Sequence, residues 1–96
     1  MEICIFARFH AKPGNEEAVS QAMLKGMIPS KEEPGCLAIQ HFRSIRDPQL
    51  FFLFSRWKDE ETFDRHAELP HTVRFLEEIE PLIDNAFDIY RTEQIR

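Results

Sequence analysis

The chain has 96 residues, a formal net charge of -5 and a hydrophobic content of 43%, which together describe one modest globular domain. Its 12 lysine and arginine residues are scattered, so the composition argues against binding to nucleic acid or to an anionic membrane surface. The amino terminus has no basic segment followed by a long apolar run, and no apolar segment approaches ~20 residues. We therefore expect a single domain over residues 1–96, located in the cytoplasm.

The first third of the chain predicts a strand followed by a helix. Residues 2–10 are rich in β-branched and aromatic side chains and end before a turn signal at residues 12–14. Asn15 can cap a helix that has two glutamates in its first turn, and Pro29 together with Pro34 is expected to end that helix. The apolar stripe of this helix consists of Val19, Ala22, Met23, Gly26 and Met27.

The middle of the chain predicts a hairpin whose second strand is central. Residues 36–44 have a strand-like pattern, and a turn at residues 46–49 leads directly into residues 50–57. Residues 50–54 are five consecutive large apolar residues, so they cannot alternate between core and water. Both faces of this strand must therefore be covered. One layer of helices covers only one face, and the chain is too short to supply another layer.

The last third predicts two helical segments. Asp59 is a good N-cap, and Phe63, His66 and Ala67 follow at a spacing that places them on one helical face. His66 is therefore expected to point inward with Phe63. Pro70 is typical of a first helical position and starts the next segment. The predicted buried stripe of that segment is Val73, Leu76, Ile79 and Ile83.

A final strand over residues 86–92 completes the order βαββαβ. With right-handed crossovers, this order predicts an α+β, ferredoxin-like monomer in which a four-stranded antiparallel sheet carries both helices on one face. The opposite face would expose Phe6, Phe52 and Phe54, an apolar patch larger than monomers usually tolerate. We therefore expect a homodimer in which the two sheet faces cover each other.

Local motifs along the chain also suggest a family. They are Pro13-Gly14 after the first strand, Glu33-Pro34-Gly35-Cys36-Leu37 at the start of the second, and Arg56-Trp57-Lys58-Asp59-Glu60-Glu61 leading to His66 and Pro70-His71. In this order and spacing, residues 2–92 resemble the antibiotic biosynthesis monooxygenase (ABM) family of dimeric α/β barrels. The resemblance implies a ferredoxin-like monomer with a pocket between sheet and helices. Some members oxidise phenolic or quinol compounds with molecular oxygen and no cofactor, and similar folds degrade haem or isomerise and epimerise small carbonyl compounds.

His66 is the predicted acid or base, because imidazole titrates near neutral pH without tuning. It also matches the histidine that the family pattern places after the tryptophan. Trp57 is the second catalytic candidate, either stacking on an aromatic substrate or holding an oxygenated intermediate. A core tryptophan and a structural histidine are the alternatives. The predicted substrate-binding residues are Phe9, Phe51, Leu53, Phe63, His71 and Arg74. His71 and Arg74 could reach the mouth of the pocket, where Arg74 could hold a phenolate or carboxylate. The alternative for both is a solvent-exposed position at the start of the helix.

The sequence predicts neither a metal nor a cofactor. His10 and His41 lie toward strand ends without a cysteine or carboxylate at ligand spacing. Cys4 and Cys36 form no CxxC pair and are expected to be reduced and packed. The sequence contains no glycine-rich phosphate loop, no GxSxG motif and no HExxH motif. It therefore gives no support for nucleotide binding, for hydrolysis by a catalytic triad or for zinc-dependent proteolysis.

Two positions depart from what the resemblance implies. Leu53 stands where the cofactor-free oxygenases carry a polar amide on the tryptophan-bearing strand. Ala7 stands where haem-degrading relatives carry an assisting asparagine on the first strand. Haem degradation is therefore the weaker enzyme hypothesis.

The leading hypothesis is a cofactor-independent monooxygenase that acts on a small aromatic or quinol-type compound with molecular oxygen. His66 would remove a proton from a substrate hydroxyl, and the resulting anion would itself reduce oxygen. The pocket would be lined by Trp57, Phe9, Phe51 and Phe63. The alternatives are an isomerase or epimerase of a small carbonyl compound, using His66, His71 and Arg74, and a dimer that binds a small apolar ligand without catalysis.

Overall fold

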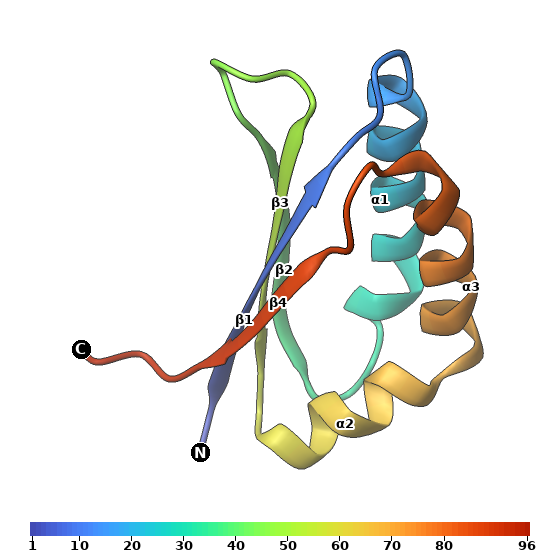
Figure 1. Ribbon diagram of the computed structural model, residues 1–96. Coiled ribbons are helices and arrows are strands. Elements are labelled where there is room, and N and C mark those ends of the chain that lie inside the picture. The colour runs from blue at the N-terminus through green and yellow to red at the C-terminus, as the bar shows by residue number, and fades with distance from the viewer.

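The computed structural model describes residues 1–96 and has the predicted order, with the second helical region divided in two. The elements are β1 (Ile3–His10), α1 (Glu16–Lys31), β2 (Cys36–Arg43), β3 (Leu50–Trp57), α2 (Glu60–Glu68), α3 (Pro70–Ile79), the short 3-10 helix η1 (Glu80–Leu82) and β4 (Asp88–Thr92). The strands form one antiparallel sheet in the order β2-β3-β1-β4. In Figure 1, α1 and α3 run side by side over one face of this sheet, and α2 closes the end of the helical layer. The fold is ferredoxin-like α+β, as predicted.

The helix-facing side of the sheet carries two buried clusters. Alternation along β1 and β3 places Ala7 opposite Leu53 and Phe9 opposite Phe51 on this side. The larger cluster contains Ala7, Phe9, Ala11, Val19, Ala22, Met23, Phe51, Ile79 and Ile83. The smaller one, at the α2 end, contains Ile3, Ile5, Trp57 and Phe63. The candidate site lies where these two clusters meet.

The opposite side of the sheet is apolar and has no helix over it (Figure 1). Phe6 is 49% exposed, Phe42 51%, Phe52 39% and Tyr90 58%. The register places Phe42 opposite Phe52, and it places Phe6 opposite both Phe54 and Tyr90, so these rings form one continuous patch. A patch of this kind marks an interaction surface.

The first helix ends at Lys31, between Pro29 and Pro34, as the two prolines predicted. Two other sequence-based details are corrected by the structure. Val73, predicted to be buried, is 43% exposed because the inward face of α3 is the one carrying Thr72 and Ile79. The final strand begins at Asp88, two residues later than predicted.

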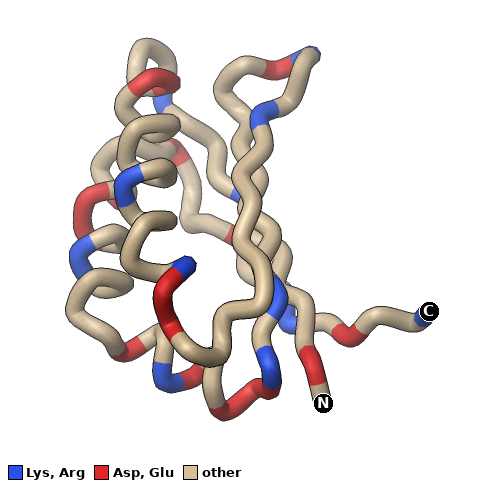
Figure 2. Tube along the Cα trace, turned by 180° about the vertical axis from the view of Figure 1, so that it is seen from behind, with Lys and Arg blue, Asp and Glu red and all other residues tan.

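Charged residues of both signs are interspersed along the helices and loops, without a basic stretch (Figure 2). Several form exposed pairs, such as Arg91 with Glu60 and Asp64, and Arg65 with Glu61. Exposed pairs of this kind contribute little to stability. None of the helices combines the length and the hydrophobicity needed to cross a membrane.

Candidate functional site

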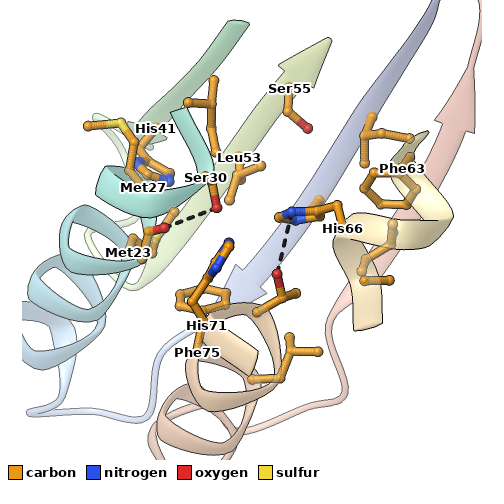
Figure 3. Close-up of a pocket in the computed structure, with 18 of the residues that line it drawn as sticks. Met23, Met27, Ser30, His41, Leu53, Ser55, Phe63, His66, His71 and Phe75 are labelled. Carbon is orange, nitrogen blue, oxygen red and sulfur yellow. Dashed lines mark hydrogen bonds between the residues drawn. The ribbon is translucent and has the colours of Figure 1, made fainter. Parts of the chain in front are cut away.

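A cavity of about 120 Å³ lies between the sheet and the three helices (Figure 3). It is lined by 19 residues, of which 12 are hydrophobic. An apolar cavity of about 150 Å³ is known to hold benzene, so the space here is of the size of one aromatic ring. The lining combines an apolar body with a few polar side chains, which is the usual composition of a small-molecule site.

Two polar residues of the lining, His66 and His71, share Glu33, which lies behind the cavity wall. Its Oε2 lies 2.7 Å from Nδ1 of His66 and 2.8 Å from Nε2 of His71. The three side chains are only 11%, 14% and 20% exposed, respectively. One carboxylate oxygen that accepts from both rings requires the proton of His66 to sit on Nδ1. The Nε2 atom of a neutral His66 then carries the lone pair that a general base needs.

His66 is held neutral by its surroundings. Burial lowers the pKa of its imidazole, and the hydrogen bond and charge of Glu33 oppose that shift only in part. The ring packs against Trp57 at 4.5 Å and against Phe63 at 5.7 Å between ring centroids. A neutral, oriented imidazole in an apolar wall is equipped to accept a proton.

Local sequence features bring the three residues of this cluster together. The side chain of Asp59 accepts from the backbone N–H of Thr62 at 2.8 Å, so the predicted N-cap starts α2 at the end of β3. Gly35 packs against Thr62, and a Cβ atom at this position would overlap the Thr62 side chain. This close approach brings the loop that carries Glu33 against α2. Leu69 then turns the backbone into an extended conformation, after which α3 presents His71 to the same carboxylate.

The structure places five of the predicted site residues on the cavity and three elsewhere. Phe9, Leu53, Phe63, His66 and His71 line it. Trp57 lies behind His66, fully buried, and its indole N–H donates to Ser55 Oγ at 2.9 Å. Phe51 belongs to the larger core cluster. Arg74 is exposed on a separate groove between α1 and α3.

Glu33 is the member of this cluster that sequence reasoning did not assign to the site. It was recognised only as part of the motif before the second strand, because nothing in the local pattern links it to residues 66 and 71. Ala7 lines the cavity opposite Leu53, so both departures from the family pattern face the same space.

Two imidazoles and a carboxylate are also a donor set that suits zinc or iron. The ligand atoms of Glu33, His66 and His71 all lie within 4.8 Å of one another. In this geometry, however, the carboxylate oxygen bonds both rings directly. Ligands around one zinc ion would stand roughly 3.3 Å apart, given metal–ligand bonds of ~2.0–2.1 Å. A metal would therefore need Glu33 to withdraw from both rings, whereas the present arrangement serves proton transfer without movement.

A second histidine cluster lies away from the cavity. His10 shows no carboxylate at ligand spacing in the sequence, but the fold places Asp84 at 2.7 Å from its Nδ1 and Asp47 at 3.2 Å from its Nε2. These contacts raise the pKa of His10, and the largest cause is the hydrogen bond that its Nδ1–H donates to Asp84. The cluster joins three segments at the far end of the sheet from α2.

The sequence profile described as antibiotic biosynthesis monooxygenase matches residues 2–78 of the chain. The chain belongs to this family. Among curated proteins, this ABM chain is similar to the protein sll1783 of Synechocystis, with 26% identity over 90 residues. The aligned region covers 91% of the ABM chain and 59% of sll1783. The chain therefore spans less than two thirds of the length of the curated relative that it matches.

Solved structures agree with the family assignment. Protein PA3566 of Pseudomonas aeruginosa is similar with a TM-score of 0.91 and 27% identity, covering 99% of the ABM chain and 95% of PA3566. An antibiotic biosynthesis monooxygenase crystal structure has a TM-score of 0.91 and 21% identity, covering 98% of the ABM chain and 99% of that protein. At this identity the second similarity supports the fold alone.

Proposed function

We propose that this ABM protein is a cofactor-independent monooxygenase that oxidises a small, single-ring aromatic or quinol-type compound with molecular oxygen. The observation that carries the proposal is the pairing of Glu33 with His66 on the wall of an apolar, ring-sized cavity. Such a site binds a flat apolar body and offers one oriented base to a hydroxyl at its edge.

The chemistry begins with proton transfer from a substrate hydroxyl to Nε2 of His66. Glu33 stabilises the imidazolium that forms, through the hydrogen bond to Nδ1. The electron-rich substrate anion then reduces dioxygen. One oxygen atom forms a new C–O bond to the ring in place of C–H, and the other leaves as water. The ring supplies all the electrons, so hydroquinone and dioxygen give hydroxyquinone and water.

The apolar lining has two roles in this reaction. Phe9, Leu53 and Phe63 exclude water from the reacting ring, which strengthens the electrostatic effect of Glu33 and protects reduced oxygen intermediates from stray protons. Trp57 acts behind His66 as a packing surface that holds the imidazole plane in place. Trp57 is thus a positioning residue in this proposal.

The direct test is oxygen uptake with hydroquinone and with substituted phenols as probes. Wild-type protein should consume oxygen and substrate in equal amounts, and removing oxygen should stop substrate loss. His66→Ala should lose at least about a hundredfold in rate, within the range of general-base contributions. Substrate consumption that continues without oxygen, or that is unchanged in His66→Ala, would refute the proposal.

An isomerase or epimerase of a small carbonyl compound is the second candidate. The specific observation in its favour is that His66 and His71 share one carboxylate, which places two oriented imidazoles at one cavity, where a proton can be taken from the substrate and returned to it. Oxygen independence distinguishes this activity from the first. Loss of activity in both His66→Ala and His71→Ala, in the absence of oxygen, would favour it.

We also propose that the protein works as a homodimer through the uncovered sheet face. Support comes from the continuous patch of half-exposed aromatic rings, which includes Phe42 and Phe52. Covering it removes apolar surface from water at about 25 cal/mol per Å². Ultracentrifugation at micromolar concentration should give a two-chain particle for the wild type and a single chain for Phe52→Glu. A wild-type protein that sediments as a single chain would overturn this assembly.

A further inference from the structure

The carboxylate of Glu33 is buried without a permanent positive charge beside it. Its side chain is 11% exposed, and its ion-pair partners are the imidazoles of His66 and His71, with no lysine or arginine among them. A carboxylate withdrawn from water is costly unless opposite charge and hydrogen bonds compensate it. Two hydrogen bonds from the rings compensate this cost in part, and a bound cation would compensate it further.

The three side chains offer the ligand atoms that a divalent cation requires. Glu33 supplies a carboxylate oxygen, His66 supplies Nδ1 and His71 supplies Nε2. Two histidines and one glutamate are a set that holds zinc with a fourth position left open. No other three histidine, cysteine, aspartate or glutamate side chains in residues 1–96 bring ligand atoms this close together.

A metal needs only small movements of these atoms. The ligand nitrogens of the two rings lie within 4.8 Å of each other, so a point midway is at most half of that distance from each. Zinc–nitrogen bonds are ~2.0–2.1 Å long, so each ring would move by a few tenths of an ångström. Oε2 of Glu33 would move from 2.7 and 2.8 Å to roughly 3.3 Å from the two nitrogens. Glu33 makes no other hydrogen bond through its side chain, so this movement breaks no further contact.

The surroundings of the cluster suit a bound cation. His66 packs on Trp57 and Phe63, which fix the plane of its ring and keep competing water away. The ring centroids of His66 and His71 lie 6.0 Å apart at the cavity (Figure 3). His71 also lines the groove between α1 and α3, so the cluster has a route to the surface.

We propose that Glu33, His66 and His71 form a binding site for a divalent cation of the zinc type. The metal takes the positions of the two protons that the rings now donate to Glu33. Each of these protons moves to the other nitrogen of its ring, so both imidazoles bind as neutral ligands. The sequence does not indicate this site, because Glu33 lies 33 residues from His66 and outside any metal-ligand spacing.

A bound metal reverses the role of His66. With the metal on Nδ1, a neutral imidazole carries its proton on Nε2, which is the atom that accepts the substrate's proton in the proposed reaction. Nε2 then donates a hydrogen bond and accepts none, so the base is blocked while the metal stays bound. This blocking role rests on the proposed function, whereas the binding of the metal does not.

The test titrates zinc chloride into protein that a chelator has freed of metal, with calorimetry as the readout. Wild-type protein should bind one zinc ion per chain. Glu33→Gln and His71→Ala should each weaken binding by at least about tenfold. His10→Ala is the matched control, because it disrupts the other histidine–carboxylate cluster and should leave the affinity unchanged. Unchanged affinity in Glu33→Gln and His71→Ala, or lost binding in His10→Ala, would overturn the site.

A second measurement needs only the wild-type protein. The chain has four histidines, whose ring signals can be followed by proton NMR. Zinc should shift the signals of His66 and His71 and leave those of His10 and His41 in place. Zinc that shifts neither His66 nor His71 would overturn the site, whether or not the variants fold.

Oxygen uptake with hydroquinone separates the site from the function. Saturating zinc should lower the wild-type rate to about that of His66→Ala. Zinc binding at the cluster without oxygen uptake under any condition keeps the site and removes the monooxygenase proposal. Oxygen uptake in a protein that binds no zinc does the reverse. Uptake that bound zinc leaves unchanged, or that requires a metal, would overturn the blocking role.

Discussion

Replacing Glu33 with glutamine removes the charge shared by His66 and His71 while keeping the volume of the side chain. The carboxylate oxygen lies 2.7 Å from Nδ1 of His66, in a site where both side chains are less than 15% exposed. Little solvent screening is therefore available between the two groups. The charge of Glu33 opposes the effect of burial on the pKa of His66.

The size of the effect follows from that geometry. When His66 takes a proton, its positive charge lies ~4 Å from the carboxylate charge, which corresponds to about 4 kcal/mol at an effective dielectric constant of ~20. The amide dipole of glutamine recovers part of this, so we expect a loss of about 2–3 kcal/mol of transition-state stabilisation. At 1.36 kcal/mol per factor of ten, kcat should fall by about 30- to 150-fold.

Two assays check this prediction. Oxygen uptake with hydroquinone gives kcat, and proton NMR titration of the histidine rings gives the pKa of His66 without any substrate. Removing the charge of Glu33 should lower that pKa further, so the acid limb of the rate profile should also move to lower pH. Glu32→Gln is the matched control, because Glu32 is the exposed neighbour of Glu33. A His66 pKa that stays the same or rises in Glu33→Gln would refute the electrostatic reasoning.

Three further predictions concern the frame around the site. Gly35→Ala should lose about 1–3 kcal/mol in urea unfolding, because the new methyl group overlaps the buried Thr62 side chain. Trp57→Phe should lose about 2 kcal/mol, since Ser55 Oγ loses its donor and a fully buried ring shrinks; unchanged stability would contradict the packing described. The raised pKa of His10 means that its ion pairs stabilise the fold fully below pH 6.5 and lose this contribution as the pH rises through the raised value. Asp84→Asn should therefore destabilise the protein more at about pH 6 than at about pH 9 in parallel urea titrations, and an equal loss at both would argue against this ion pair.

The sequence predicted the elements whose signals are local. The apolar run of residues 50–54 identified β3, which the structure places inside the sheet between β2 and β1. Asp59 marked the start of α2, where its carboxylate does cap the helix. The position of His66 on the inner face followed from helical spacing with Phe63. Each of these inferences depends on residues a few positions apart, where periodicity and capping decide the conformation.

The candidate site was predicted less completely, because its central contact is long-range. Glu33 and His66 are brought together by the packing of Gly35 on Thr62, and no local pattern encodes that approach. The position of Trp57 relative to the cavity also depends on tertiary packing that no local pattern encodes. Alternation put it on the correct face of β3, but α2 and Ser55 enclose it behind His66, off the cavity wall.

Oxygen uptake by wild-type protein and by His66→Ala, with hydroquinone as the probe, tests the central claim most directly. The account predicts stoichiometric consumption of oxygen in the wild type and a rate at least about a hundredfold lower in a His66→Ala protein that remains folded. Equal rates in the two proteins would contradict the assignment of His66 as the base of this cavity.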